Sequence, residues 1–417
     1  RFVEYSGADI YRANYQGDIG PHIARCLWGL KAKGLDPMNI KDLGDAYVAG
    51  TAAYEGDPAA KEEMDDINQR LYASDPELKK VYDIGRKTSL DHFEELYKVL
   101  GTRFDHYFFE SETAPIGLMM VEEAHAKGIL EESDGAIVYK GEKAGLHTRV
   151  FVTKKGTPTY ETKELGLAKA KYDLFPYDLN VTTIAVEQDQ YFKVVEAALS
   201  ELWPLMKGRY THVAFGMMQL TSGKMSSRKG NIITGDSLIE DIRAKALKKM
   251  EGRDLGDTKH EIADAVAVAA IKYSILKQAR GKNIIFDPEA SLSFEGDSGP
   301  YLQYSHVRAL SVLAKAKPNS PIYGRGELSG ALPKDIPDFE RLLPRFPDVV
   351  MRAAKEYEPH HVTTYLTELA SAFNSWYAEG RIIGSPEEAY KLALTRAFAT
   401  TMKNGLWLLG IEAPEKM

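Results

Sequence analysis

The spacing of apolar residues changes once along the chain, and this change constrains the fold more than any other feature. Over residues 1–220, short apolar runs typical of strands alternate with segments of helical spacing. The strand-like runs include "FDHYFFES", "GRYTHVAFGMM" and "DLNVTTIAV", and we expect the last of these to be buried. A further run, "GLHTRVFVTKKGTPTY", predicts a β-hairpin that turns at Lys155 and Gly156. Because strands that alternate with helices favour a parallel sheet, residues 1–220 predict an α/β domain.

Beyond residue 236 the pattern is helical only. The segment "DSLIEDIRAKALKKM" is amphipathic, and Asp236 is its expected N-cap. Proline and glycine gather in residues 318–337, which we expect to form a surface loop. We therefore expect an α/β domain over residues 1–220, a helical connector over 221–290 and a helical domain over 291–417. The predicted fold class is α/β followed by all-α.

Composition narrows the class of protein. At 417 residues the chain is too long for one core, and it lacks an apolar run of about 18 residues that could span a membrane. The formal net charge of −7 argues against a protein that coats nucleic acid, although it leaves local recognition open. One cysteine, Cys26, excludes an intrachain disulfide and a thiolate-rich metal site. We expect no protein-bound metal, no membrane partner and a cytoplasmic location.

The segment "GKMSSRKGN" at 223–231 has the chemistry of a phosphate-binding loop. It follows a predicted strand, and ligands bind at the carboxyl edge of parallel sheets. Its glycines let the backbone approach an anion, while Lys224, Arg228 and Lys229 supply positive charge for a leaving pyrophosphate. The alternative is an ordinary basic turn, which is the commoner origin of such a pattern.

Four sets of residues, in the same order along the chain, resemble arginyl-tRNA synthetases of class I. The segment "GKMSSRKGN" resembles the family's KMSKS loop, and "RANYQGDIGPHIARCLWGL" (12–30) resembles the segment after its first catalytic motif. Two further segments resemble the family's amino-acid pocket: "YETKELGLAKAKYD" (160–173) and "VEQDQYFKVV" (186–195). Two more resemble its anticodon-binding domain: "GDSGPYLQYSHVRAL" (296–310) and "KNGLWLLGIEAPEKM" (403–417). The resemblance covers essentially the whole chain.

This resemblance implies ATP-dependent attachment of arginine to its tRNA, through arginyl-adenylate, by a Rossmann-like catalytic domain followed by a helical anticodon-binding bundle. Magnesium would accompany ATP. The catalytic residues it implies are Lys224, Ser226, Ser227, Arg228 and Lys229. The residues implied for arginine are Tyr160, Glu164 and Gln188, and those for ATP are His212, Gly216, Met217, Lys224 and Arg228. The residues implied for the anticodon are Tyr301, Gln303, Tyr304, Arg308 and Met417.

Simpler interpretations of these residues stay open at this point. Glu164 could be a solvated charge near the start of a helix, where it favours the helix dipole. Phe215 and Met217 could be core residues, and Tyr301 with Tyr304 could form a half-buried contact on one helix face.

The family's first catalytic motif, HIGH, has no match in this sequence, and we expect it upstream of residue 1. The sequence is therefore expected to represent a truncated form, or one part of a split enzyme whose other part contains HIGH, and to have little activity alone. We expect a monomer. A non-catalytic tRNA-binding or regulatory protein is the alternative function. Another class I ligase, such as a cysteinyl enzyme, is disfavoured because cysteine-rich zinc chemistry needs more than one cysteine.

Overall fold

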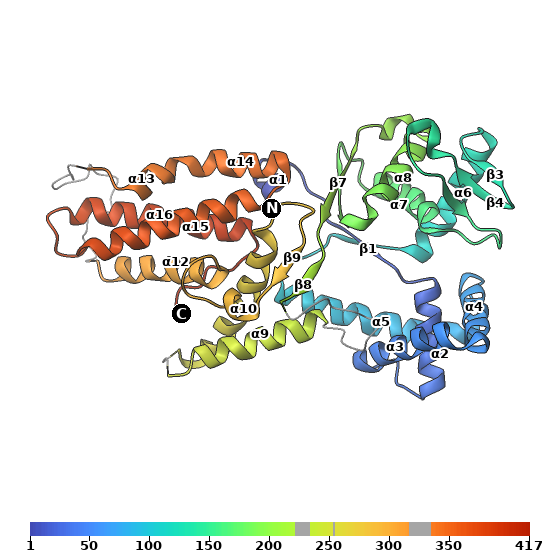
Figure 1. The fold of residues 1–417 in the computed structure, drawn as a ribbon, viewed down its shortest axis with the longest axis horizontal. Coiled ribbons are helices and arrows are strands. Elements are labelled where there is room, and N and C mark those ends of the chain that lie inside the picture. Colours follow the sequence, from blue (N-terminus) through green and yellow to red (C-terminus); the bar gives the residue numbers. More distant parts are fainter. Residues whose placement is uncertain (222–233, 253–254, 317–334) are drawn as a thin grey trace. The chain divides into compact units, whose positions relative to one another are not determined.

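The computed structural model describes residues 1–221, 234–252, 255–316 and 335–417 (Figure 1). The chain divides into two compact units, which we describe separately. The α/β unit comprises residues 11–98 and 102–212. The helical unit comprises residues 1–10, 99–101 and 213–417.

A pair of parallel strands begins the α/β unit. Strand β1 (Ala13–Gln16) pairs with β2 (His106–Phe109), with Ala13 opposite His106 and Gln16 opposite Phe109. The four helices that connect them are α2 (Pro21–Lys33), α3 (Ile40–Gly56), α4 (Pro58–Tyr72) and α5 (Pro76–Val99). Helices α2 and α3 cross closely at Gly29, because a Cβ atom there would lie 2.0 Å from the carbonyl oxygen of Ala46. The parallel pairing confirms that this part of the sequence is α/β.

Helices α6 (Glu110–Ala126) and α7 (Tyr160–Leu174) also pack closely against each other. A Cβ atom at Gly117 would lie 2.0 Å from the carbonyl oxygen of Thr162, and one at Gly166 would lie 2.0 Å from that of Thr113. No side chain fits at either crossing point, so these two glycines set the distance between the helices.

The predicted β-hairpin is only partly correct. Strand β5 (Arg149–Val152) pairs with β4 (Ala136–Tyr139), and β4 pairs with β3 (Glu131–Ser133). The turn at Lys155 and Gly156 is present, with Gly156 at a φ of 77°, but the returning chain forms a single bridge between Val152 and Pro158. The Thr159 amide still donates to the Phe151 carbonyl oxygen at 2.9 Å, but the pairing stops there because α7 begins at Tyr160.

The last part of the α/β unit contains β6 (Asn180–Ala185), α8 (Asp189–Leu202) and β7 (Tyr210–Phe215), whose last residues continue into the helical unit. Strands β6 and β7 form a two-stranded sheet. The prediction of a buried strand over "DLNVTTIAV" is wrong, since only Ile184 of β6 is buried. Exposure alternates along β6, with Val181 and Thr183 exposed, because side chains alternate between the two faces of the strand and only one face is covered by protein.

The helical unit contains a strand pair as well, so the expectation of helices only beyond residue 236 is wrong. Strand β9 (Ile284–Phe286) pairs in parallel with β8 (Met218–Leu220). Three apolar residues give too short a pattern to identify a strand. The N-cap of α9 (Gly235–Lys249) is Thr234 instead of Asp236, because the Thr234 hydroxyl accepts a hydrogen bond from the Ser237 amide.

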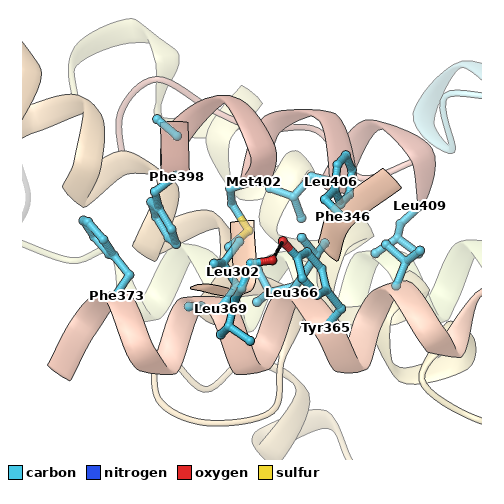
Figure 2. Close-up of a cluster of buried hydrophobic side chains, with 14 of the residues drawn as sticks. Leu302, Phe346, Tyr365, Leu366, Leu369, Phe373, Phe398, Met402, Leu406 and Leu409 are labelled. Atoms are coloured by element: carbon cyan, nitrogen blue, oxygen red, sulfur yellow. Dashed lines mark hydrogen bonds between the residues drawn. The ribbon is translucent and has the colours of Figure 1, made fainter. Parts of the chain in front are cut away.

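Except for α11, the remaining helices contribute to one apolar core of the helical unit (Figure 2). They are α1 (Phe2–Tyr5), α10 (Lys259–Leu276), α11 (Pro288–Ser291), α12 (Gly299–Ala314), α13 (Asp338–Leu342), α14 (Phe346–Glu356), α15 (His360–Glu379) and α16 (Glu388–Leu408). The rings of Phe373 and Phe398 stack with centroids 3.8 Å apart, and both side chains are fully buried. In the part of the chain that the structure describes, no helix has the length and apolar character needed to cross a membrane.

Candidate active site

The KMSKS-like segment lies outside the residues that the structure describes. The roles expected for Lys224, Ser226, Ser227, Arg228 and Lys229 therefore stay predictions.

Glu164 lines a pocket of the α/β unit between α7, α8 and the strands β6 and β7. Leu167, Phe192 and Leu199 are among its apolar walls. Its polar lining residues are Glu164, Lys171, Asn180, Thr182, Glu196, Tyr210 and His212. Glu164, which is predicted to bind arginine, and His212, which is predicted to bind ATP, line the same pocket, and both roles stay predictions. The half-burial of Glu164 argues against the alternative of a solvated charge at a helix start.

Glu164 lies in the lining of the pocket without a direct counter-charge. The residue is half-buried, and the protein around its carboxyl group disfavours the charged form. Among the described residues, no side chain forms an ion pair or a hydrogen bond with it. Burial raises the pKa of Glu164 to about 7; the positive charge of Lys171 opposes this increase, while Glu110 and Glu161 add to it. Such a carboxylate favours binding of a cation, because the ligand supplies the missing positive charge.

Lys171 is the cation that acts most strongly on Glu164, and it is itself half-buried. Burial lowers the pKa of Lys171 below its usual value, while the charge of Glu164 opposes this decrease. The two groups therefore influence each other's ionisation across the pocket without forming an ion pair.

Three tyrosines lie close enough to Glu164 for its charge to act on their hydroxyl groups. Burial first, and the charge of Glu164 in addition, raise the pKa of Tyr15, Tyr191 and Tyr210. The Tyr15 hydroxyl lies 3.1 Å from the hydroxyl oxygen of Thr113. The Tyr191 hydroxyl is buried and has no hydrogen-bond partner in the described structure. Neutral hydroxyls of this kind can accept hydrogen bonds from a ligand with many N–H donors.

His212 lies on β7 at the other side of the pocket. Its Nδ1 atom is 3.9 Å from Oε2 of Glu196, and its ring centroid is 4.8 Å from that of Phe192. Burial lowers the pKa of His212 below its usual value. A neutral imidazole can hydrogen-bond to a ligand without adding charge to the pocket.

The other two residues predicted for arginine do not line this pocket. Tyr160 is 58% exposed, although it lies one helical turn before Glu164 on α7. Gln188 is exposed, and its Oε1 atom accepts a hydrogen bond from the Ala185 amide at 3.4 Å.

A second buried polar group lies where the parallel strands β1 and β2 end. The Asp18 carboxylate accepts hydrogen bonds from the Tyr82 hydroxyl at 2.8 Å and from the Ser111 amide at 2.9 Å. The Arg86 Nε atom lies 3.3 Å from Asp18 Oδ2. Because the carboxyl ends of parallel strands lie at one edge of a sheet, Asp18 after β1 and Ser111 after β2 meet there.

The sequence patterns did not identify several of these residues. Tyr15, Tyr191 and Tyr210 come from three different elements, and Glu110 and Lys163 form a buried ion pair at 2.5 Å. A helical pattern would place a lysine such as Lys163 in solvent, and the partner that keeps it buried lies 53 residues away in the sequence.

The residues expected to contact adenine belong to the helical unit. Gly216 is buried, and a Cβ atom there would lie 2.0 Å from the carbonyl oxygen of Lys282. The Met217 amide donates to Asn283 Oδ1 at 3.1 Å, and the Met217 side chain is 45% exposed. Exposure of Met217 argues against the alternative that its side chain is part of the core.

On the helical unit, α12 and α15 present an aromatic and polar surface. The guanidinium of Arg308 lies 4.9 Å from the Tyr304 ring centroid and donates to Asn374 Oδ1 at 2.6 Å. The Asn374 amide in turn donates to the Tyr301 hydroxyl at 3.1 Å. We call Tyr301, Tyr304, Arg308, Asn374 and Tyr377 the aromatic patch; Tyr377 lies 5.3 Å from Arg308 and is 38% exposed.

Two other residues predicted to contact the anticodon have different surroundings. Gln303 is fully buried, and its amide donates to the carbonyl oxygens of Ala265 at 3.2 Å and Glu412 at 2.8 Å. This burial argues against a contact between Gln303 and RNA. Met417 packs against the apolar cluster that α9 and α10 form.

Comparison with known proteins identifies the family of this chain. Residues 1–288 match the family model of the class I tRNA synthetases (R), catalytic domain, and residues 302–417 match the DALR anticodon binding domain. An arginine–tRNA ligase of Streptococcus thermophilus is 34% identical over 430 residues, which cover 100% of this chain and 74% of that protein. An arginine–tRNA ligase of Streptococcus pneumoniae is 33% identical over 420 residues, with 99% and 74% covered.

A solved structure supports the same assignment. The arginyl-tRNA synthetase of Thermus thermophilus superposes with a TM-score of 0.80 at 26% identity, over 100% of this chain and 77% of that one. Three observations point to the same family: the class I catalytic fold, the helical domain that follows it and the sequence identity over the full chain. The chain belongs to the arginyl-tRNA synthetase family.

Proposed function

We propose that the chain attaches arginine to tRNA, and that the pocket around Glu164 binds the guanidinium group of arginine. The half-buried, unpaired carboxylate of Glu164 in the pocket lining is the observation that supports this pocket most strongly. A guanidinium carries five N–H donors and a permanent positive charge, and it pairs well with a carboxylate and further oxygen acceptors. The hydroxyl of Tyr210, which lines the pocket, is such an acceptor.

As a member of this family, the chain uses ATP. In the first step, a carboxylate oxygen of arginine attacks the α-phosphorus of ATP, and the bond to the bridging oxygen of pyrophosphate breaks with its electron pair. In the second step, the terminal ribose hydroxyl of tRNA attacks the arginyl carbonyl, and AMP leaves. Both steps depend on positioning and charge stabilisation.

We assign the stabilising charges to Lys224, Arg228 and Lys229, with Ser226 and Ser227 as hydrogen-bond donors to phosphate. Magnesium would enter with ATP and add positive charge at its phosphates. We assign His212, Gly216 and Met217 to the nucleotide, the last two through their backbone.

We assign the aromatic patch to the anticodon loop of tRNA. RNA loops are recognised by stacking of bases on aromatic rings and on guanidinium planes. Tyr304 and Arg308 offer both surfaces. We further propose boundaries near residues 220 and 290 for the catalytic domain, the connector and the anticodon-binding domain, and a monomer that functions in the cytoplasm.

The test is Glu164→Gln in the intact enzyme, measured by ATP–pyrophosphate exchange with tRNA present. We expect the KM for arginine to rise by about 100-fold, or roughly 3 kcal/mol, because a neutral amide does not pair with a guanidinium. The KM for ATP should stay within about twofold. The matched control is Glu122→Gln on the exposed side of α6, and an unchanged arginine KM in Glu164→Gln would reject the pocket.

A further inference from the structure

The α/β unit contains one buried ion pair whose role the reaction leaves unexplained. Lys163 Nζ lies 2.5 Å from Oε2 of Glu110, and the two side chains are only 5% and 6% exposed. Burial opposes the charge on Lys163, but the charge of Glu110 and its hydrogen bond outweigh this, so the pKa of Lys163 lies above its usual value. Lys163 therefore keeps its charge, although the pair is almost entirely shielded from solvent.

The surroundings of this pair show what it connects. Lys163 Nζ also lies 3.5 Å from the carbonyl oxygen of Ile19, in the loop between β1 and α2. Its ammonium group lies 5.2 Å from the Tyr160 ring and 5.8 Å from the Tyr72 ring. Lys163 thus joins the first turn of α7 to the end of β1 and, through Glu110, to the first residue of α6.

Lys163 directly precedes Glu164 in the same helix. Helix α7 is held on α6 by the close contacts at Gly117 and Gly166, so a change at Lys163 is transmitted to Glu164 through a rigid element. Glu110 also acts on the pocket through its charge. It disfavours ionisation of Glu164, Tyr15 and Tyr191.

The charged and titratable groups that face Glu164 come from every element packed around it. From α7 and α6 they are Lys171, Glu161 and Glu110. From β1, α8 and β7 they are Tyr15, Tyr191, Glu196, Tyr210 and His212. Arg149 lies 3.9 Å from Glu161 and partly offsets that carboxylate, while Lys163 offsets Glu110.

We propose that Lys163 is a positioning residue for arginine: its ion pair with Glu110 fixes the first turn of α7 and offsets the negative charge of Glu110 beside Glu164. This inference rests on the proposed function, since it assumes that the ionised Glu164 binds the guanidinium. Lys163 itself is not a contact of arginine in this proposal. Its effect on arginine passes through Glu164.

The two halves of the pair give opposite expectations. Without Lys163, the charge of Glu110 is uncompensated, so Glu164 should ionise at a higher pH. Without Glu110, Lys163 remains as an uncompensated positive charge, so Glu164 should ionise at a lower pH. A purely structural role predicts a loss in the same direction for both variants and no movement along the pH axis.

The experiment measures kcat and the KM for arginine between pH 6 and about pH 8.5 in the intact enzyme, across the range in which a carboxyl group like that of Glu164 titrates. For Lys163→Met, we expect the midpoint of the kcat/KM profile to move about one pH unit to the alkaline side, with the arginine KM about tenfold higher near neutral pH. For Glu110→Gln, the midpoint should move to the acidic side, and the double variant should return close to the parent.

Three controls accompany these variants. The KM for ATP should not change in any of them. Lys163→Arg should keep most of the parent behaviour, because it keeps the positive charge beside Glu110. Lys169→Met is the matched control, since Lys169 is an accessible lysine of α7 whose ammonium group pairs with Asp173 on the same helix.

The outcomes separate this inference from the function on which it rests. If Glu164→Gln leaves the arginine KM unchanged, the proposed pocket is wrong. Suppose instead that Glu164→Gln abolishes the pH dependence. If Lys163→Met and Glu110→Gln then move the midpoint in the same direction, or do not move it, only the positioning role of Lys163 is wrong. Should Lys163→Met fail to fold, Glu110→Gln and the double variant still decide the question, because the double variant leaves no unpaired buried charge.

Discussion

The core of the helical unit and the pocket of the α/β unit differ in their polar groups. In the helical unit, Leu366, Phe373 and Phe398 are fully buried among other apolar groups (Figure 2). The buried hydroxyl of Tyr365 there donates to the Leu342 carbonyl oxygen at 3.1 Å. In the α/β unit, the Glu164 carboxylate, which lines the pocket, and the buried Tyr191 hydroxyl have no partner in the described structure.

This difference separates residues that stabilise the fold from residues that prepare it for a ligand. A buried polar group without a partner lowers stability, and it is retained where a ligand supplies the partner. Removing an apolar side chain from the core should therefore cost stability and spare arginine affinity. Removing the charge of Glu164 should do the reverse.

The largest expected effect is on stability, in the core of the helical unit. Phe398→Ala removes a ring that stacks on Phe373 at 3.8 Å, and we expect the free energy of unfolding to fall by about 4 kcal/mol. Chemical denaturation of the intact enzyme, followed by circular dichroism, measures this. The arginine KM at a temperature where the variant is folded should equal that of the parent. A loss below about 1 kcal/mol would show that this core is not tightly packed at Phe398.

The contrast between these regions also determines what the sequence could predict. The α/β pattern, the helix at α7 and the candidate residue Glu164 follow from local spacing and from a family resemblance, and both kinds of signal are contiguous in the chain. The tyrosines around Glu164 and the partner of Lys163 depend on long-range packing, which a local pattern does not encode. Strand β9 was missed for a similar reason, because its three residues become a strand only by pairing with β8.

The second expected effect tests whether the buried charge of Glu164 costs stability. The folded-state pKa of Glu164 is raised to about 7 from a usual value of 4.5. Between these two pH values the folded chain retains a proton that the unfolded chain releases, so the contribution of Glu164 to stability is lost as the pH rises and stays lost above the folded-state pKa. Glu164→Gln removes this titration, and near pH 8 the ligand-free variant should be more stable than the parent by about 2 kcal/mol.

Measurement of this effect needs two pH values. Thermal or urea unfolding at about pH 4.5 and about pH 8 should show a small difference between Glu164→Gln and the parent at the lower pH and the full difference at the higher one. Glu122→Gln should show neither. A variant that is less stable than the parent at the higher pH would mean that the Glu164 carboxylate has a partner in the ligand-free protein, which contradicts the contrast drawn above.

The smallest expected effect is on the binding of tRNA by the aromatic patch, which lies on the surface of the helical unit. Tyr304 is half-buried beside Arg308, so replacing it by alanine removes a stacking surface without opening the core. We expect Tyr304→Ala to raise the KM for tRNA about fivefold, or roughly 1 kcal/mol, and to leave the KM for arginine unchanged.

The control for this variant is Met351→Ala, which removes an exposed apolar side chain from α14. Binding of tRNA by both variants should be compared at two salt concentrations, because phosphate contacts weaken with added salt while base stacking depends on it much less. If Tyr304→Ala instead lowers the unfolding free energy as strongly as Phe398→Ala, Tyr304 belongs to the core, and the aromatic patch is part of the scaffold. If affinity for tRNA falls while stability is kept, the helical unit separates the two roles by depth: apolar rings inside hold the bundle together, and the aromatic patch outside meets RNA.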